Sequence, residues 1–227
     1  MNRYRHEYKY ILDMCQENIL QIRTAGIMQR DSHTNDDGMY TVRSLYFDDY
    51  NDSCYFENQS GTDIRSKFRI RYYENNANNI MLEKKSKCRG MTMKESCRIS
   101  AEECTMLIEG KVIEVQEDMS AVKKKLLLEI QKRMLEPKVI VTYDRVPFVY
   151  GAGNVRVTFD KNITSSSDIS NFLKADYRQR PIMANGKNVL EVKWDELLPL
   201  HIKEMLQLDT LQWNSFSKYY MSREYHL

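Results

Sequence analysis

The sequence has little of what the commonest nucleotide-binding and membrane-spanning structures require. Among its 227 residues there are only eight glycines, and neither a Gly-x-x-x-x-Gly-Lys-Ser/Thr run nor a Gly-x-Gly-x-x-Gly run is present. These absences exclude the P-loop and the dinucleotide-binding fingerprint. No stretch approaches about 18 uninterrupted apolar residues, so a membrane-spanning helix is not expected. The N-terminus, MNRYRHEYKY, also lacks the apolar run of a signal peptide.

The five cysteines form no recognisable pattern. They lie at positions 15, 54, 88, 97 and 104, which is an odd number without a Cys-x-x-Cys pair. This spacing argues against a zinc site and against a disulfide framework. Thiols that are neither bridged nor metal-bound suit a reducing compartment, so we expect a cytoplasmic protein.

Positive charge is concentrated locally. The net charge of the chain is only +2, which does not suit a protein that coats nucleic acid, and nucleic acid is not an expected partner. Between Gly61 and Ser100, however, ten lysines and arginines stand against four acidic residues. A local excess of this size generates a strong positive field.

Part of this excess lies on one strand, RSKFRIRYY. Its cations alternate with Phe68, Ile70 and Tyr72, at positions 65, 67, 69 and 71. Side chains alternate faces along a strand, so the four cations share one face. Such a face is either a solvated edge that blocks aggregation or a surface that holds a polyanion.

Strand-like and helical segments both occur, which predicts an α+β protein. The expected strands are residues 4–11, 40–48, 64–73, 79–86, 92–98, 138–146, 155–160 and 188–194. The expected helices are residues 12–29, 101–109, 118–135, 168–175 and 197–207. Several strands have one charged and one apolar face, and the helices have apolar stripes that need a partner. We therefore expect a single domain over residues 1–227, in which a sheet curls with its charged face inward and helices pack outside.

Three strands carry a glutamate and a lysine two positions apart, on the same face. The pairs are Glu7 with Lys9, Glu83 with Lys85, and Glu191 with Lys193. Lysine and arginine can clamp phosphate oxygens. Glutamates repel phosphate, but they fit a site where a divalent cation lies between carboxylate and phosphate. Each single pair can also be an ordinary salt bridge.

At this point the chain resembles a known family. The elements RHEYKY, VRSLYFDD, KFRIRYY, IMLEKKSK, MTMKE, VTYDRVPF, NVRVTFD, VLEVKW and SFSKYY occur in the order found in the VTC domain, a polyphosphate polymerase domain. This domain is one of the triphosphate tunnel metalloenzymes, which also include inorganic and RNA triphosphatases. The resemblance covers about residues 3–220.

The resemblance implies a fold, a reaction and a site. The fold would be an antiparallel eight-stranded β-tunnel, a closed barrel with a charged interior. The reaction would transfer the γ-phosphate of ATP to a polyphosphate chain in the tunnel, with Mn²⁺ or Mg²⁺ as cofactor. The implied phosphate clamp consists of Lys9, Arg69, Arg71, Lys85, Lys94, Arg145, Arg156, Lys193, Ser217 and Lys218. Of these, we expect catalytic roles for Lys9, Arg69, Arg71, Lys85, Arg156 and Lys193.

The remaining candidates come from the strand faces and from the implied metal site. Lys67 and Arg43 are added as phosphate-binding residues because they lie on charged strand segments. Glu191 is the implied metal ligand, and Glu7 and Glu83 occupy matching positions on other strands. The expected partners are ATP or another triphosphate and inorganic polyphosphate, and we expect a monomer.

One departure from the family pattern bears on the reaction. The wider family often begins with Glu-x-Glu-x-Lys, whereas Arg5 stands here in place of the first glutamate. Loss of an inner carboxylate favours polyanion binding over a two-carboxylate hydrolytic site. Two alternatives remain open: a metal-dependent inorganic or nucleoside triphosphatase, and a non-catalytic polyphosphate-binding module.

Overall fold

A computed structural model describes residues 4–74, 76–208 and 211–226. Eight strands form one antiparallel sheet in the order β1-β10-β8-β7-β3-β4-β5-β6, and the short strands β2 and β9 pair with β7 and β8. The main strands are β1 (His6–Leu12), β3 (Tyr40–Asp48), β4 (Arg65–Tyr73), β5 (Asn76–Cys88), β6 (Met91–Ile99), β7 (Glu136–Tyr150), β8 (Val155–Ser166) and β10 (Asn188–Trp194). The short ones are β2 (Gln29–Arg30) and β9 (Arg180–Pro181).

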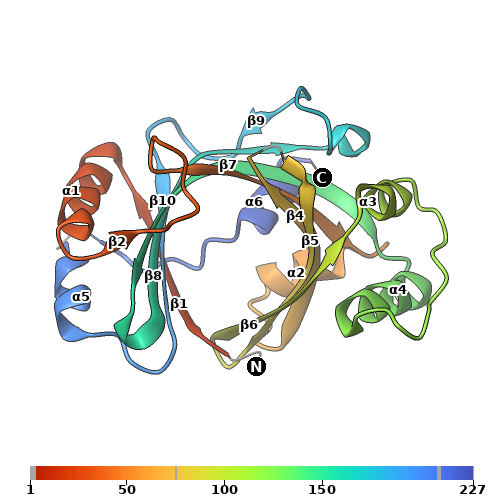
Figure 1. Cartoon of the computed structure of the whole chain (residues 1–227), viewed down its shortest axis with the longest axis horizontal. Helices are drawn as coiled ribbons and strands as arrows, with labels where there is room; N and C mark the ends of the chain where they lie inside the picture. The colour runs from red at the N-terminus through yellow and green to blue at the C-terminus, as the bar shows by residue number, and fades with distance from the viewer. Residues whose placement is uncertain (1–3, 75, 209–210, 227) are drawn as a thin grey trace.

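The sheet is strongly curled, but it is a half-barrel, and the expected closed barrel is wrong. Figure 1 shows the sheet arching over helix α6 (Lys218–Glu224). Among the described residues, the edge strands β1 and β6 are joined by one isolated bridge, between Arg5 and Thr92, instead of a continuous ladder. Residues 211–216 run along the free edge of β1, where the amide of Asn214 donates to the carbonyl of Lys9 at 2.9 Å. A non-sheet segment therefore occupies the edge where the family pattern predicted strand pairing.

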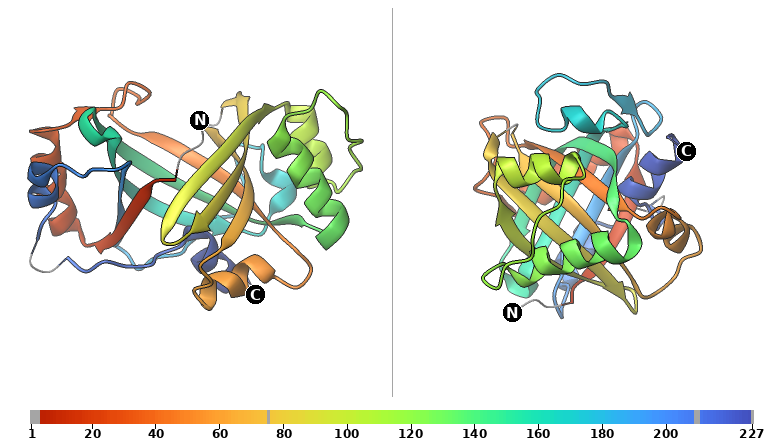
Figure 2. Two further views of the ribbon diagram at one scale, coloured as in Figure 1. Left: turned by 90° about the horizontal axis from the view of Figure 1, so that it is seen from below. Right: turned by 90° about the vertical axis from the view of Figure 1, so that its right-hand side faces the viewer.

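Helices cover the outer face of the sheet at both ends (Figure 2). The predicted helices at 12–29, 101–109, 118–135 and 197–207 are confirmed in shorter form, as α1 (Met14–Ala25), α3 (Ala101–Ile108), α4 (Ala121–Arg133) and α5 (Leu200–Met205). Residues 168–175 contain only a short 3-10 turn, Ile169–Asn171. Helices α2 (Ser53–Gln59) and α6 were not expected from the sequence. No helix in the described part of the chain is long and apolar enough to cross a membrane.

Two apolar cores lie between the outer face and these helices. At one end, Phe68, Ile70 and Tyr72 of β4 pack with Leu126 and Leu127 of α4. At the other end, residues of β8 and β10 pack with α1 and α5, including Val157, Val192, Leu20 and Ile202. The alternation of strand RSKFRIRYY is thereby explained, because its apolar side chains are buried under helices while its cations point inward.

The inner face is charged over only part of its area. Tyr46, Val141 and Tyr143 pack there against Phe216 and Tyr219 of the C-terminal segment. Met81 and Val189 also lie on the inner face. Met81 is paired with Arg71, and Val189 is paired with Asp160, and partners in an antiparallel pair share a face. Charge and apolar packing thus divide the concave side between them.

Candidate active site

A cavity of about 480 Å³ lies on the concave side of the sheet. Strands β1, β4, β5, β7 and β10 contribute to its wall, together with the C-terminal segment. Within the described part of the chain, eleven lysines and arginines line it against two glutamates. The basic lining residues are Lys9, Arg65, Lys67, Arg69, Arg71, Lys85, Lys87, Arg89, Arg145, Lys193 and Lys218. This excess of positive charge is the main property of the cavity.

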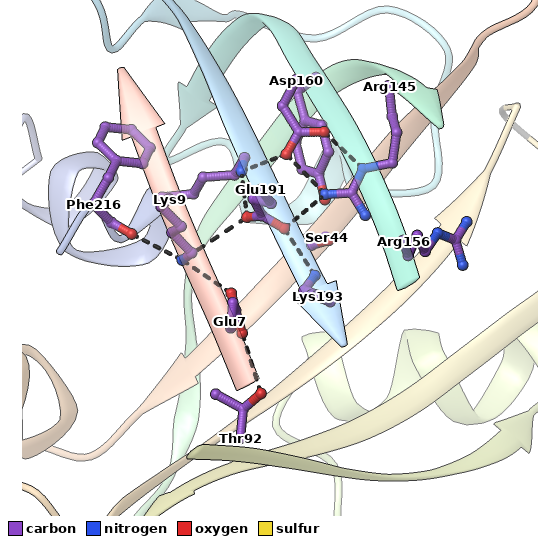
Figure 3. A network of polar contacts seen from close by, with 12 residues as sticks. Glu7, Lys9, Ser44, Thr92, Arg145, Arg156, Asp160, Glu191, Lys193 and Phe216 are labelled. Carbon is purple, nitrogen blue, oxygen red and sulfur yellow. Dashed lines mark hydrogen bonds and ion pairs between the residues drawn. The ribbon is translucent and has the colours of Figure 1, made fainter. Parts of the chain in front are cut away.

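Glu191 lies at the centre of the charge network in Figure 3. Its carboxylate accepts from Lys193 Nζ at 2.8 Å, from Lys218 Nζ at 3.0 Å and from an Arg145 amino group at 3.3 Å. Burial alone would raise the pKa of Glu191. Lys193, Lys218, Lys9 and Arg145 outweigh burial and hold that pKa well below its usual range. Glu191 is therefore an ionised carboxylate surrounded by cations.

Glu7 forms a second carboxylate on the neighbouring strand. It accepts from Lys85 Nζ at 2.7 Å and from the Thr92 hydroxyl at 3.2 Å. Lys9 lies between the two glutamates, with Nζ 3.3 Å from Glu7 and 3.8 Å from Glu191. Although burial opposes ionisation, Lys85, Lys9 and Lys193 hold the pKa of Glu7 well below its usual range. Both carboxylates thus converge on the ammonium of Lys9.

Arg69 and Arg71 are held in place by groups on three strands. Arg69 donates to Glu83 at 2.7 Å and to the Tyr46 hydroxyl at 3.1 Å. Arg71 donates to the Ser44 hydroxyl at 2.9 Å and to the Tyr143 hydroxyl at 3.0 Å. These contacts fix both guanidinium groups before any ligand arrives, and a pre-ordered Arg fork suits planar recognition of phosphate.

Four cations form an outer group, here called the basic rim: Arg65, Lys67, Lys87 and Arg89. Arg89 and Gly90 both have positive φ, at 50° and 76°, and they make the two-residue turn between β5 and β6. In the described residues, Lys67 donates to Asn58 at 3.0 Å and Arg65 to the Thr62 carbonyl, while Lys87 and Arg89 have no polar partner. Within the described part of the chain, no member of the basic rim forms an ion pair.

Burial and mutual repulsion lower the pKa values of the two lysines in the basic rim. Burial lowers the pKa of Lys67 to about 7, and the charges of Arg65 and Lys9 act in the same direction. Burial and the same two neighbours also lower the pKa of Lys87. Glu7 and, less strongly, Asp63 offset a part of this lowering of the Lys87 pKa. A group of cations that destabilise one another favours the binding of an anion.

Helix α6 delivers Lys218 into the cavity. Ser217 caps the helix by accepting from the amide of Tyr220 at 3.3 Å. The Tyr219 hydroxyl donates to the buried carboxylate of Asp48, and Arg223 donates to Asp52 at 2.5 Å. Inside the cavity, the Lys218 ammonium pairs with Asp160 at 2.6 Å and with Glu191 at 3.0 Å. Burial opposes its charge, but Asp160 and, less strongly, Glu191 outweigh burial and raise the pKa of Lys218 above the usual value. The short helix is thus anchored from outside and charged on its inner side.

The cavity brings together most of the residues predicted from the sequence. Lining it are Lys9, Lys67, Arg69, Arg71, Lys85, Arg145, Lys193, Ser217, Lys218, Glu7 and Glu191. Glu83 lies behind this wall and is 1% exposed, where it supports Arg69. Lys94 donates to the other oxygen of Glu83 at 2.9 Å and does not line the cavity.

Arg43 and Arg156 lie outside the cavity. Arg43 is paired with Tyr72 on the outer face, where it donates to the Tyr72 hydroxyl at 2.6 Å and to the carbonyls of Phe172 and Lys174. Arg156 extends away from Glu191 in Figure 3 and donates to Asp31 at 2.6 Å. These placements argue against contact between either guanidinium and a ligand in the cavity.

Asp160, Lys87 and Arg89 were missed as site residues. Asp160 is fully buried and accepts two hydrogen bonds from Arg145, at 2.6 and 2.7 Å. Asp160 is paired with Arg145 on the neighbouring strand, and this pairing places Asp160 on the inner face. Lys87 extends the inner-facing series of Glu83 and Lys85 by two positions, whereas Arg89 lies in the turn after β5. A strict period-2 count would have found Asp160 and Lys87.

Glu7 and Glu191 suit a divalent cation only if phosphate oxygens of a bound ligand complete its coordination. Among the described residues, no three His, Cys, Asp or Glu side chains are grouped as a metal site. Mg²⁺, however, is commonly bound by one or two carboxylates together with substrate phosphates. Glu7 and Glu191 offer such a pair, because both reach the position now held by the ammonium of Lys9. The donor set fits a cation that binds with a triphosphate.

A curled antiparallel sheet with a cation-lined cavity and buried carboxylates on its concave side defines a protein of the triphosphate-tunnel type. The chain belongs to the VTC domain family, whose model matches residues 4–226. No curated protein matches its sequence. Arg5, which replaces the first glutamate of the wider pattern, does not line the cavity, because it pairs with Asp195 at 2.7 Å. Position 5 therefore removes a carboxylate from the family pattern without adding a cation to the cavity lining.

Solved structures share the fold at low sequence identity. A protein from Hippeastrum, HpAC1, described as having a dominant triphosphatase activity, is 14% identical with a TM-score of 0.57; the match covers 99% of this chain and 96% of that one. PH1819 from Pyrococcus horikoshii is 13% identical with a TM-score of 0.50, over 98% of this chain and 99% of that one. At these identities the comparison establishes the fold and leaves the reaction to be argued from the site.

Proposed function

We propose that the protein is a metal-dependent phosphotransferase that extends polyphosphate with the γ-phosphate of ATP. The observation that carries this proposal is the cavity itself, in which lysines and arginines outnumber carboxylates by eleven to two among the described residues. Such an excess is unfavourable in the absence of a polyanion and becomes favourable when several phosphates enter.

Two zones of charge suit two phosphorylated reactants. In the inner zone, Arg71 and Lys218 are buried and Arg69 is half-buried, and all three are held by neighbouring side chains, which suits a triphosphate fixed in one position. In the outer zone, the basic rim lacks ion-pair partners in the described residues and suits a second polyanion. A hydrolase needs only the first zone, because its acceptor is water.

The reaction needs positioning and neutralisation of charge rather than a protein nucleophile. A terminal oxygen of the polyphosphate chain attacks the γ-phosphorus, the bond to the β–γ bridging oxygen breaks, and ADP leaves. Arg69, Arg71 and Lys85 would neutralise charge on the transferred group, and Lys218 and Arg145 would orient the rest of the triphosphate. A divalent cation held by Glu191 and Glu7 would supply further positive charge to the phosphate oxygens.

Triphosphate hydrolysis is the second candidate. It is favoured by the similarity to the Hippeastrum protein, which is described as having a dominant triphosphatase activity. The same binding of a triphosphate supports hydrolysis if water, rather than a terminal oxygen of the polyphosphate chain, attacks the γ-phosphorus. The charge of the basic rim is the feature that favours polymer synthesis.

Product analysis distinguishes these functions. The purified protein is incubated with ATP and Mn²⁺ or Mg²⁺, and nucleotide, free phosphate and polymer are measured together. We expect ADP to appear with polyphosphate in equal phosphate equivalents. ADP with free phosphate alone would assign a triphosphatase, and tight polyphosphate binding without turnover would assign a binding module. Omission of metal and addition of EDTA should both stop turnover.

A further inference from the structure

Among the described residues, none accepts the proton of the Tyr46 hydroxyl. Tyr46 belongs to β3 and lines the cavity, and its oxygen accepts a hydrogen bond from an amino group of Arg69 at 3.1 Å. We propose that the Tyr46 hydroxyl donates to an oxygen of the phosphoryl group that Arg69 binds, which makes this neutral side chain a further substrate-binding residue. This inference rests on the proposed function, from which it takes the binding of a phosphoryl group beside Arg69.

The hydrogen bonds of a second tyrosine show what Tyr46 lacks. A phenolic hydroxyl can accept through its oxygen and can donate its one proton. Tyr72 does both, because it accepts from Arg43 at 2.6 Å and donates to the Phe172 carbonyl at 2.7 Å. Tyr46 also accepts from an arginine, but in the described part of the chain no atom lies in position to accept from it. Since Tyr46 is only 8% exposed and lines the cavity, an acceptor reaches its proton from the cavity.

The cations around Tyr46 favour a negatively charged acceptor. Burial alone would raise the pKa of Tyr46, but Arg69, Arg71 and Lys218 outweigh burial and lower that pKa. A more acidic phenol donates a stronger hydrogen bond, and such bonds are strongest when the acceptor carries a charge. The same three cations attract an anion to this part of the cavity. A phosphate oxygen therefore meets both the positive charge and the proton of Tyr46 at one place.

Neighbouring strands hold the Tyr46 hydroxyl and the Arg69 guanidinium side by side. The two residues are directly paired between β3 and β4, so both side chains lie on the inner face. The Tyr46 ring packs against the Tyr219 ring of α6, with centroids 5.3 Å apart, and Arg69 donates to Glu83 of β5 at 2.7 Å. Two donors that lie 3.1 Å apart, each fixed by contacts of its own, can bind two oxygens of one phosphoryl group.

A structural role as a holder of Arg69 explains the Tyr46 hydroxyl poorly. Two nitrogens of Arg69 already lie 2.7 and 2.6 Å from one carboxylate oxygen of Glu83. Contacts between two charged groups are stronger than a contact with a neutral phenol. The bond from Arg69 to Tyr46 is also the longest of the three, at 3.1 Å. Loss of this bond should leave Arg69 in place, so that a change in ligand binding reports on the proton of Tyr46.

Calorimetry with tripolyphosphate and Mg²⁺ measures the contribution of this proton. Tyr46→Phe removes the hydroxyl and keeps the ring that packs against Tyr219. We expect the affinity to fall at least fivefold, equivalent to about 1 kcal/mol. Tyr40→Phe is the matched control, because Tyr40 is also buried and also accepts from an arginine, Arg156 at 2.9 Å, but does not line the cavity. The affinity of this control should change less than twofold.

The salt dependence of binding separates a neutral donor from a cation. A hydrogen bond from a phenol releases no counterion, whereas each cation that contacts phosphate contributes to the slope of affinity against salt. Tyr46→Phe should therefore lower the affinity for tripolyphosphate by the same factor at about 50 and 200 mM salt, while Arg69→Ala should reduce the slope. A reduced slope in Tyr46→Phe would show that Arg69 had moved away from the phosphate, and it would overturn direct donation by Tyr46.

A double variant tests whether Tyr46 acts only through Arg69. The measurement is made at low salt, where Arg69→Ala binds most tightly. If the hydroxyl contacts the phosphate directly, Tyr46→Phe should still lower the affinity for tripolyphosphate at least about threefold in a protein that already carries Arg69→Ala. If the hydroxyl only positions the guanidinium, the second substitution should change nothing, and the proposal is wrong.

The outcomes also distinguish this inference from the proposed function. If wild type and Tyr46→Phe bind tripolyphosphate equally well, Tyr46 is not a donor, and the proposed function is unaffected. If wild type binds tripolyphosphate but makes no polymer from ATP, the proposed function is wrong, and the affinity of Tyr46→Phe still decides the role of the hydroxyl. If wild type does not bind tripolyphosphate, both the proposed function and the role of Tyr46 are wrong.

Discussion

Glu191 is the residue whose removal should be most informative. It is ionised because Lys193, Lys218, Lys9 and Arg145 surround it, and it is the carboxylate best placed to share a divalent cation with a phosphate. Glu191→Gln keeps the shape of the side chain but offers a neutral amide, which is a poor divalent ligand. We expect turnover of ATP to be abolished.

Binding should respond differently from turnover in this variant. Loss of one negative charge leaves the surrounding cations less compensated, so tripolyphosphate should raise the melting temperature of Glu191→Gln at least as much as that of wild type. Differential scanning fluorimetry with and without the ligand measures this shift. Normal turnover by the variant, or wild-type turnover in EDTA, would rule out metal binding at Glu191.

Lys67 should make polyanion binding depend on pH near neutrality. Its folded-state pKa of about 7 lies below its ordinary value, so the side chain is charged below pH 7 and neutral above it. Affinity for tripolyphosphate should therefore fall as pH rises from 6 to 8. Lys67→Met should bind more weakly at pH 6 and lose much of this dependence, whereas Lys132→Met, on an exposed part of α4, should match wild type.

The same shift has a consequence for stability. Between pH 7 and the unfolded-state value near 10.4, the unfolded chain binds more protons than the folded one at Lys67, so this residue makes stability rise with pH in that window. A wild-type protein whose affinity for tripolyphosphate stayed level from pH 6 to 8 would show that Lys67 keeps an ordinary pKa.

Strand β4 illustrates how one element can carry residues of different importance. Arg71 is buried and Arg69 is half-buried, and Glu83, Ser44 and Tyr143 hold both in place, whereas Arg65 lies in the basic rim. Arg69→Ala or Arg71→Ala should lower turnover at least tenfold, equivalent to about 1.4 kcal/mol of barrier. Arg65→Ala should weaken capture of long polyphosphate and leave turnover at saturating ATP within a few-fold. Equal losses in all three, measured by steady-state kinetics, would contradict the division into two zones.

Helix α6 depends on contacts made on its outer side. The Tyr219 hydroxyl donates to Asp48, a fully buried carboxylate that also accepts from the amides of Asp49, Cys54 and Tyr55. Tyr219→Phe removes a hydrogen bond to a charged group and should lower the free energy of unfolding by about 1.5–3 kcal/mol. Urea denaturation measures the loss. Tyr220→Phe, which removes an exposed hydroxyl from the same helix, should leave the midpoint unchanged.

The elements show where sequence reasoning succeeds. Strands β3 and β10 begin and end at the predicted residues because both are rich in β-branched and aromatic residues and are bounded by Gly, Asn and Asp. Helices α2 and α6 are seven residues each, too short for a clear periodic signal, and their stability comes from tertiary contacts such as that of Tyr219 with Asp48. Contacts of this kind connect residues far apart in the sequence, and no local pattern reports them.

The site was predicted to the extent that strand faces could be assigned. Lys9, Arg69 and Lys193 reach the cavity because period-2 alternation fixes which side chains share a face. Arg43 was misassigned because both faces of β3 are largely apolar, so the sequence does not tell which face is concave. The prediction of a closed barrel failed for another reason, because pairing of β1 with β6 depends on the curvature of the whole sheet.

At the scale of the whole molecule, the affinity for polyphosphate should depend strongly on the salt concentration. Because many cations contact the ligand at once, counterion release should lower the affinity for long polyphosphate at least about tenfold between 50 and 200 mM salt, as it does for nucleic acids. Fluorescence anisotropy of labelled polyphosphate measures the slope. The double variant Lys87→Gln/Arg89→Gln should flatten it, and Lys132→Gln should not. A level response in wild type would exclude a polyphosphate-filled cavity.

The bridge between Arg5 and Thr92 determines how a long polymer can reach the cavity. If β1 and β6 were paired along their whole length, a polyphosphate chain would have to enter the barrel end first. Here the two edges are joined by two backbone hydrogen bonds, of 2.8 and 2.9 Å, and by the hydrogen bonds that Thr92 and Lys85 donate to Glu7. Because no further backbone pairing joins β1 to β6 among the described residues, transient parting of this seam breaks far fewer contacts than global unfolding does. A polyphosphate blocked at both ends by bulky groups could then be laid in sideways, and the length of the polymer would set no limit on its entry.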